Sequence, residues 1–136
     1  MTKRVLLDES VPRQLAVPLD AAGFLTTPYP NEWKQMKNGE LLMLAEKNAF
    51  DVLITSDKNI YAQQNLRGRK LAVVVLPTNR RRDILERASD IVDTVERIMP
   101  GQYVVVEMTG QRPIINHGAG ESAGDEMPAI APFKTK

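Results

Sequence analysis

The sequence predicts an α/β protein with three α/β/α layers and a mostly parallel sheet of about four to five strands. Short, continuous apolar runs alternate along the chain with longer segments in which apolar residues recur at helical spacing. Continuous apolar runs are typical of parallel strands that are covered on both faces. The segments between the runs are long enough to be right-handed helical crossovers, so we expect the strands to end at one common edge of the sheet.

The chain begins with an apolar run over residues 5–7 that predicts a buried strand. The helix expected over residues 11–22 has Ser10 as its N-cap and Pro12 in its first turn, where the missing N–H costs nothing. A short strand is expected over residues 24–27, before a loop that contains two prolines.

The same alternation of strands and helices continues to residue 108. After that residue the chain becomes rich in Gly, Pro and Ala without a sustained period. We therefore expect one domain over residues 1–108 and a flexible C-terminal tail over residues 109–136. The further strands are expected over residues 50–55, 71–76 and 102–108, and the further helices over residues 39–48, 58–65 and 80–99.

The amino-acid composition limits the cellular compartment in which the protein is expected and the ligands that it can offer to a metal ion. The chain has no cysteine, which fits a reducing compartment and leaves oxygen ligands and the single histidine for any metal ion. No apolar run approaches the roughly 20 residues of a membrane span. The net charge of +1 is too small to indicate nucleic-acid binding by itself, which therefore depends on local clusters of Lys and Arg. We expect a cytoplasmic protein without a membrane segment.

Acidic and polar side chains follow two of the predicted strands and begin one of the helices. Because the strands are expected to end at one edge of the sheet, these side chains are expected to gather there. A divalent cation relieves the repulsion between such carboxylates, and oxygen ligands favour Mg²⁺ or Mn²⁺. A cation in this position can bind a phosphate group. Phosphodiester hydrolysis follows if a metal-bound water attacks the phosphorus in line with the leaving oxygen. The expected metal ligands are Asp8, Glu9, Glu40, Asp57 and Asn59.

Local structure alone also accounts for these residue types. Asp57 and Asn59 are good helix caps, and an acid such as Glu40 in a helix's first turn is favoured by the helix dipole whatever its function. Glu9 reaches the same site as Asp8 only if the backbone turns there, because successive side chains of an extended chain point to opposite sides. The prediction therefore rests on the whole set of residues.

Three motifs carry a family resemblance. They are Leu6-Leu7-Asp8-Glu9 with Pro12, Asn38-Gly39-Glu40-Leu41-Leu42 with Leu44-Ala45, and Val52-Leu53-Ile54-Thr55-Ser56-Asp57-Lys58-Asn59. Together they resemble the PIN-like proteins of the DUF5615 family, over roughly residues 4–105. The resemblance implies that the domain of residues 1–108 is PIN-like, a compact relative of PIN-domain ribonucleases. It further implies an acidic Mg²⁺ or Mn²⁺ site, catalytic roles for Asp8, Glu40 and Asp57, RNA as substrate, and, for a toxin of this kind, a small antitoxin protein as partner.

Two positions depart from the family's pattern. Asn59 stands where related sequences often carry Asp, and Asn38 where they often carry Asp or Ser. Many PIN nucleases offer four acids, so the case for a second metal ion is weaker here. The alternative is a catalytically inactive PIN-like module that binds a protein or RNA. A phosphoacceptor receiver-like domain is a third interpretation, which the Lys58-Asn59 pair after Asp57 does not favour.

Basic residues supply the candidate contacts to RNA, although most basic runs are solvated faces. Three arginines stand at the start of the helix expected over residues 80–99, at the same edge of the sheet as the acids. Tyr29 and Trp33 are placed to stack on bases or, more commonly for loop aromatics, to pack within the protein or in a homodimer, which we expect. The candidate RNA contacts are Lys58, Arg80, Arg81 and Arg82, with Lys34, Lys37, Arg67, Arg69 and Lys70 as further basic residues.

Overall fold

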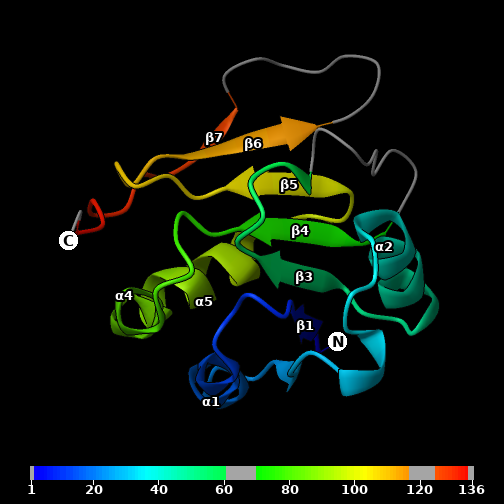
Figure 1. Ribbon diagram of the computed structural model, residues 1–136. Helices are drawn as coiled ribbons and strands as arrows, with labels where there is room; N and C mark the ends of the chain where they lie inside the picture. Colours follow the sequence, from blue (N-terminus) through cyan, green and yellow to red (C-terminus); the bar gives the residue numbers. More distant parts are fainter. Residues whose placement is uncertain (1, 61–69, 117–124, 135–136) are drawn as a thin grey trace.

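The computed structural model describes residues 2–60, 70–116 and 125–134, which form one sheet with helices packed against it (Figure 1). Its seven strands are arranged in the order β2-β1-β3-β4-β5-β6-β7. The strands are β1 (Arg4–Leu7), β2 (Leu25–Thr27), β3 (Val52–Thr55), β4 (Ala72–Val75), β5 (Gln102–Val105), β6 (Arg112–Asn116) and β7 (Glu126–Met127). The helices are α1 (Ala16–Ala21), α2 (Asn38–Lys47), α4 (Arg81–Glu86) and α5 (Ala88–Arg97), with 3-10 turns η1 (Arg13–Leu15) and η2 (Asn31–Trp33).

The α/β class is confirmed, whereas a mostly parallel sheet of four to five strands is wrong. Strands β2, β1, β3, β4 and β5 are parallel, as their alternation with helices predicts. Strand β6 pairs antiparallel with β5, and β7 pairs antiparallel with β6. Both additional strands come from the segment expected to be a tail, so the sheet of the described residues is larger than predicted and mixed.

Successive residues of the central strands face opposite helix layers. Leu6 and Leu53 pack with α2 on one face of the sheet. Their neighbours Leu7 and Ile54 pack with α1, α4 and α5 on the other face. All four side chains are fully buried. Helices therefore cover both faces of these strands, which explains why the strands are apolar at every position.

The register of β1 and β3 positions the candidate site. Leu7 pairs with Ile54 at the ends of these parallel strands. The N–H of Asp8 then donates to the carbonyl of Ile54 at 2.8 Å, which extends the pairing by one residue. Asp8 and Thr55 therefore emerge side by side where the parallel strands end. We call this border of the sheet the C-terminal edge.

Two of the predicted helices have different bounds in the structure. The helix expected over residues 80–99 is divided into α4 and α5 at Arg87, whose φ of −109° and ψ of 24° are not helical. Ile84 and Ile91, on either side of the division, still face the same core, so hydrophobic spacing alone does not reveal it. Residues 61–65 of another predicted helix lie outside the described residues. In the described part of the chain, none of the helices has the length and apolar character needed to cross a membrane.

The segment after residue 108 is anchored to α5 by a buried arginine. Arg112 of β6 is 1% exposed. Its Nη1 donates to Oδ2 of Asp93 at 2.7 Å and to Oγ1 of Thr94 at 2.9 Å, and its Nε donates to the Pro128 carbonyl at 2.8 Å. Burial acts to raise the pKa of Asp93, but hydrogen bonds from Arg112 and Arg97 outweigh this effect and hold that pKa below its ordinary value.

The last described residues lie against α4. Arg87 donates to the carbonyls of Ala131 at 2.7 Å and Pro132 at 3.0 Å, and its guanidinium lies 4.3 Å from the centre of the Phe133 ring. Phe133 is buried in the same core as α1, α4 and α5. Within the segment expected to be a flexible tail, residues 109–116 and 125–134 thus contribute β6, β7 and contacts to α4, and the rest of the segment lies outside the described residues.

Candidate functional site

Asp8 and Asp57 meet at the hydroxyl of Thr55, the last residue of β3. Oγ1 of Thr55 donates to Oδ2 of Asp8 at 2.9 Å and accepts the backbone N–H of Asp57 at 3.1 Å. Thr55 is 1% exposed, whereas Asp8 and Asp57 are half-buried. A fixed interior hydroxyl therefore holds two acidic residues from separate loops at the C-terminal edge.

Two further side chains complete this hydrogen-bond network. Oγ of Ser10 donates to Oδ2 of Asp8 at 2.8 Å and accepts the N–H of Ser56 at 3.3 Å, so it does not cap a helix as predicted. Nδ2 of Asn38 donates to Oδ2 of Asp57 at 2.9 Å. The start of α2 is thereby joined to the loops after β1 and β3.

Glu9 shares the environment of Asp8 because the backbone turns after β1. The N–H of Val11 donates to the Asp8 carbonyl at 3.0 Å and closes the turn. Both acids line a depression of about 310 Å³ together with Tyr29. Burial raises the pKa of Tyr29, and the charges of Asp8 and Glu9 raise it further, so this phenol stays protonated at neutral pH.

In the part of the chain that the structure describes, neither Glu40 nor the Asn59 side chain hydrogen-bonds to this network. An α-helix turns by about 100° per residue, so Glu40 lies about 200° around α2 from Asn38, the residue that faces Asp57. Glu40 is exposed. Asn59 is also exposed and contacts Asp57 through its backbone N–H, which donates to Oδ1 at 2.9 Å. Among the described residues, no three Asp, Glu or His side chains lie close enough together to hold a metal ion.

The chemistry of the site fits a Mg²⁺ or Mn²⁺ ion that is held by few protein ligands. Mg²⁺ is usually bound by one or two carboxylates, and waters and substrate phosphates fill its other positions. Asp8 and Asp57 supply two carboxylates at the C-terminal edge, and the Ser10 and Thr55 hydroxyls and the Asn38 amide N–H hold them there by hydrogen bonds. Such carboxylate oxygens suit hard divalent cations.

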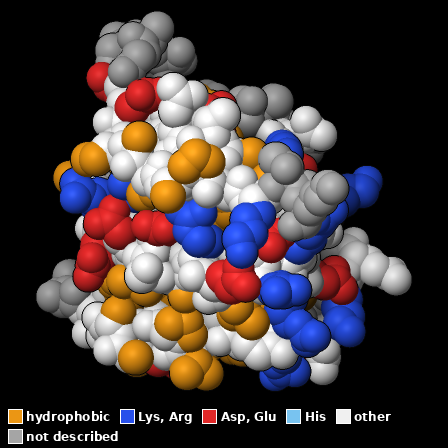
Figure 2. Space-filling model, turned by 90° about the vertical axis from the view of Figure 1, so that its left-hand side faces the viewer, with side chains coloured by type: hydrophobic (Ala, Val, Ile, Leu, Met, Phe, Trp, Pro, Cys, Tyr) orange, Lys and Arg blue, Asp and Glu red, His pale blue; other side chains and the backbone are white. Residues whose placement is uncertain are grey.

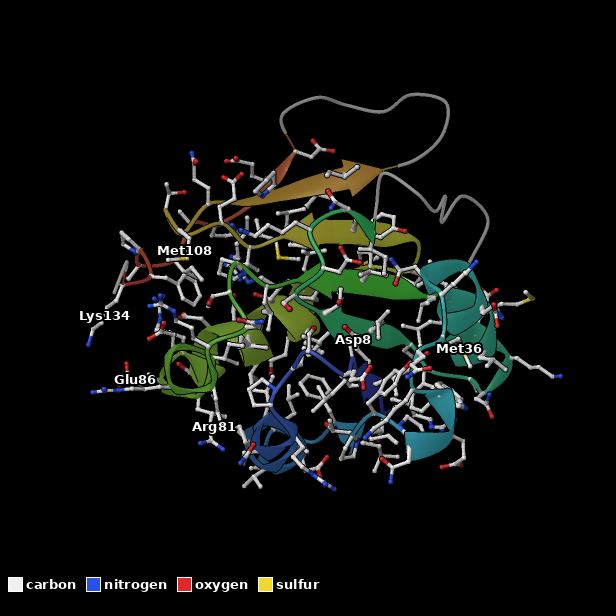
Figure 3. All side chains as sticks on the ribbon, in the orientation of Figure 1. Asp8, Met36, Arg81, Glu86, Met108 and Lys134 are labelled. Carbon is white, nitrogen blue, oxygen red and sulfur yellow. The ribbon has the colours of Figure 1, made fainter. Side chains whose placement is uncertain are left out.

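The predicted arginine contacts at the start of α4 have different surroundings. Arg81, labelled in Figure 3, lines a second depression of about 530 Å³ beside the loop after β1, together with Glu9. Arg80 is exposed at the N-cap of α4. Arg82 is exposed as well, and its Nε lies 3.4 Å from Oε1 of Glu86. Arg81 therefore shares a depression with Glu9, a predicted metal ligand.

Lys58 lies at another part of the C-terminal edge. It lines a depression of about 340 Å³ with Pro77, Glu107 and Met108, beyond the ends of β4 and β5. The structure therefore does not place Lys58 in the same depression as Asp8. Figure 2, which faces the C-terminal edge, shows Lys and Arg side chains with Asp and Glu among them across the middle of this surface.

The two loop aromatics have different environments. The Trp33 ring is held edge-on between Tyr29 and Phe50, with ring centres 6.4 Å and 6.5 Å apart. Trp33 packs against the core on the α2 face of the sheet, whereas Tyr29 also lines the depression that contains Asp8. Tyr29 is therefore the aromatic ring closer to the candidate site.

Sequence reasoning missed the side chains of Ser10, Thr55 and Asn38 as partners of the two acids. The sequence does contain a signal for Thr55, which is the polar residue at the end of an apolar run. Because β1 and β3 pair Leu7 with Ile54, the next residues, Asp8 and Thr55, are neighbours. Ser10 and Asn38 carried no comparable signal, since both residue types are ordinary helix caps.

The C-terminal edge thus combines two carboxylates fixed by hydrogen bonds with cations on the neighbouring loop and helix. No protein-family model matches the chain, and no curated protein or solved structure matches it.

Proposed function

We propose that the protein is a metal-dependent ribonuclease of PIN-like type that hydrolyses RNA phosphodiester bonds with Mg²⁺ or Mn²⁺. The observation that supports this function best is the link from Asp8 through the Thr55 hydroxyl to Asp57. It fixes two acids from separate strand ends at the edge where open α/β sheets bind their ligands. Hydrolysis of this kind needs no nucleophile from the protein, so the protein has to supply only oxygen ligands for the metal ion.

The residues of the site have distinct roles in this proposal. Ser10 and Thr55 both donate to Oδ2 of Asp8, and within the described part of the chain no hydrogen bond engages its Oδ1. Asn38 and the N–H of Asn59 orient Asp57, whose carboxylate has further lone pairs for a cation. The chemistry supplied by Mg²⁺ or Mn²⁺ when bound is Lewis-acid stabilisation of phosphate charge and activation of water.

A second candidate function is a catalytically inactive PIN-like module that binds RNA or a protein. The observation in its favour is that hydrogen-bond donors already engage both carboxylates, while no third acid of the described residues joins them. Such donors stabilise two negative charges without a metal ion. This candidate predicts RNA or protein binding with no cleavage and no carboxylate-dependent metal binding.

Toxin activity relieved by a small antitoxin protein and a homodimer belong to the same proposal, and the family resemblance supports them. A cytoplasmic location is part of the proposal as well, and the lack of cysteine in the sequence supports it. Growth arrest on expression in a bacterial host, absent with Asp8→Asn, tests the toxin activity. Light scattering of the purified protein measures its oligomeric state.

Cleavage of a fluorescent RNA by the purified protein tests the proposed function. We expect activity with Mn²⁺ or Mg²⁺ and none in EDTA. Asp8→Asn and Asp57→Asn each remove a ligand charge and are expected to lower the rate by roughly 10- to 100-fold or more. Asp51→Asn is the matched control, because this exposed acid precedes β3 at the opposite border of the sheet and its Oδ2 accepts the Arg4 N–H. Cleavage in EDTA, or equal rates in all three variants, would contradict the proposal.

Asn38→Asp tests the same site by adding a carboxylate instead of removing one. Nδ2 of Asn38 lies 2.9 Å from Oδ2 of Asp57, so the substitution places a third carboxylate beside the proposed metal ligands. We expect tighter Mn²⁺ binding and a higher cleavage rate at limiting Mn²⁺, because the added charge attracts the cation. An unchanged Mn²⁺ affinity in a folded Asn38→Asp variant would count against a metal site at this position.

A further inference from the structure

The two depressions along the loop after β1 adjoin each other and share part of their lining. The first contains Asp8, and the second contains Arg81. Glu9, Val11 and Arg13 line both, which makes the depressions adjoining parts of one surface feature. We call this feature the rim groove. Its volume, about 310 Å³ in the first part and about 530 Å³ in the second, is of the size that binds small ligands or short polymer segments.

Three exposed cations line the rim groove together with the acids. Lys34 lies in the part that contains Asp8, Arg81 lies in the other part, and Arg13 lines both. Arginines elsewhere on α4 and α5, such as Arg82 and Arg97, form ion pairs with carboxylates one helical turn away. Within the described part of the chain, no such ion pair engages the three groove cations, so their charge is free to bind phosphates.

Tyr29 gives the rim groove an aromatic surface beside Asp8. Its hydroxyl donates to the Trp33 carbonyl, and its ring meets the Trp33 ring edge-on at 6.4 Å. These contacts fix the orientation of a ring that lines the groove. An aromatic ring in a basic groove is the arrangement by which proteins stack the unpaired bases of single-stranded nucleic acids.

We propose that the rim groove binds single-stranded RNA, with backbone phosphates on Lys34, Arg13 and Arg81 and an unpaired base stacked on Tyr29. This inference rests on the proposed function, because the acids in the groove repel phosphates unless a divalent cation lies with them. The strand then passes Asp8 in the first part of the rim groove, which places one phosphodiester at the acids. Arg13, which is outside the predicted set of contacts, becomes the central phosphate ligand.

Fluorescence anisotropy of a short, labelled single-stranded RNA of mixed sequence tests this inference. The measurements use the full chain carrying Asp8→Asn, which slows cleavage, with and without Mg²⁺ and over a series of salt concentrations. Lys34→Ala, Arg13→Ala and Arg81→Ala are each expected to weaken binding several-fold and to lower the salt dependence by about 0.7 in log–log slope, because each loses one phosphate contact. Lys47→Ala is the matched control, since this exposed lysine ends α2, about 13 Å along the helix from Asn38.

Two further variants test the aromatic contact. Tyr29→Phe keeps the ring and is expected to retain affinity, whereas Tyr29→Ala is expected to lose about five- to tenfold. Circular dichroism and thermal unfolding establish that each variant is folded. If the three groove variants bind the RNA as tightly as Lys47→Ala does at every salt concentration, the groove is not the binding surface. Equal affinity for a double-stranded RNA of the same length would contradict the proposal that the groove binds single-stranded RNA.

The outcomes separate this inference from the proposed function. If RNA binding depends on the groove cations but the wild-type protein does not cleave RNA, the rim groove is the RNA-binding surface and the proposed nuclease function is wrong. If the protein cleaves RNA with a metal ion, but its cleavage rate and RNA affinity do not depend on Lys34, Arg13 and Arg81, the nuclease function is supported and the rim groove is not the RNA-binding surface.

Discussion

The Thr55 hydroxyl donates a hydrogen bond of 2.9 Å to the Asp8 carboxylate and thereby joins the ends of two neighbouring parallel strands. The same hydroxyl accepts the N–H of Asp57 at 3.1 Å. One interior side chain therefore sets the positions of both acids on which the proposed activity depends, although Thr55 itself is almost completely buried.

Replacing Thr55 by Val tests this positioning role. Val keeps the shape of the side chain but removes the donor to Asp8 and leaves the Asp57 N–H without its acceptor. We expect the free energy of unfolding to fall by about 1–2 kcal/mol and RNA cleavage to fall with it. Urea denaturation and the cleavage assay measure the two effects. Thr55→Ser, which keeps the hydroxyl, is the control and is expected to retain most of the cleavage. Wild-type cleavage by Thr55→Val would show that the acids are positioned without this hydroxyl.

Replacing Arg112 by Met tests how the C-terminal segment is held. The substitution removes the buried partner of Asp93 and leaves the Thr94 hydroxyl and the Pro128 carbonyl without their donor. We expect the free energy of unfolding to fall by about 3 kcal/mol. Arg97→Met is the matched control, because Arg97 pairs with the same carboxylate at 3.0 Å from an exposed position and is expected to cost about 0.5 kcal/mol. Similar urea midpoints for both variants would contradict a special role for Arg112.

The lowered pKa of Asp93 predicts a loss of stability in acid. Burial opposes the shift, but the hydrogen bonds from Arg112 and Arg97 make the pKa lower in the folded protein than in the unfolded chain. The unfolded chain therefore binds the proton first, so this contribution is fully present above about pH 4 and is lost as the pH falls through the folded pKa. Asp93→Asn is expected to be less stable than wild type at pH 7, with a difference that narrows below about pH 4. A constant difference across urea melts at each pH would refute this linkage.

Gly110 tests the close packing of the C-terminal segment. Its φ is +92°, and a Cβ atom there would lie 2.0 Å from the Ile130 carbonyl oxygen. Gly23 has a similar φ of +101°, but a Cβ atom at that residue would meet nothing within 4 Å, so Gly23→Ala reports backbone strain alone. We expect Gly110→Ala to cost roughly 1–3 kcal/mol more than Gly23→Ala, because the Ile130 backbone must move. Equal thermal unfolding temperatures for Gly110→Ala and Gly23→Ala would show that the Ile130 backbone moves without loss of stability.

The parallel strands could be predicted from the sequence, whereas the antiparallel ones could not. Residues 52–55 and 72–75 are buried at every position and almost entirely apolar, which is the pattern of strands covered on both faces. Strand β6 carries Arg112 and Pro113, a combination that carries no such signal. Its order comes from contacts distant in sequence, above all those of Arg112 with Asp93 and Pro128, which local patterns do not record.

The candidate site shows the same division. Asp8 and Asp57 lie near each other because both closely follow parallel strands, which the order of the elements predicts. The position of Glu40 depends on the rotation of α2 about its axis. Asn38 faces Asp57, so Glu40 does not, and hydrophobic spacing does not determine that rotation closely enough to distinguish the two residues.

Isothermal titration with Mn²⁺ tests the central claim most directly, because a shared cation is what the Asp8 and Asp57 carboxylates are proposed to hold. The wild-type protein is predicted to bind Mn²⁺, Asp8→Asn and Asp57→Asn to bind it about 10- to 100-fold more weakly, and Asp51→Asn to bind it as the wild type does. No Mn²⁺ binding by the folded wild-type protein, or binding of equal strength in all of these variants, would contradict a metal site at the C-terminal edge.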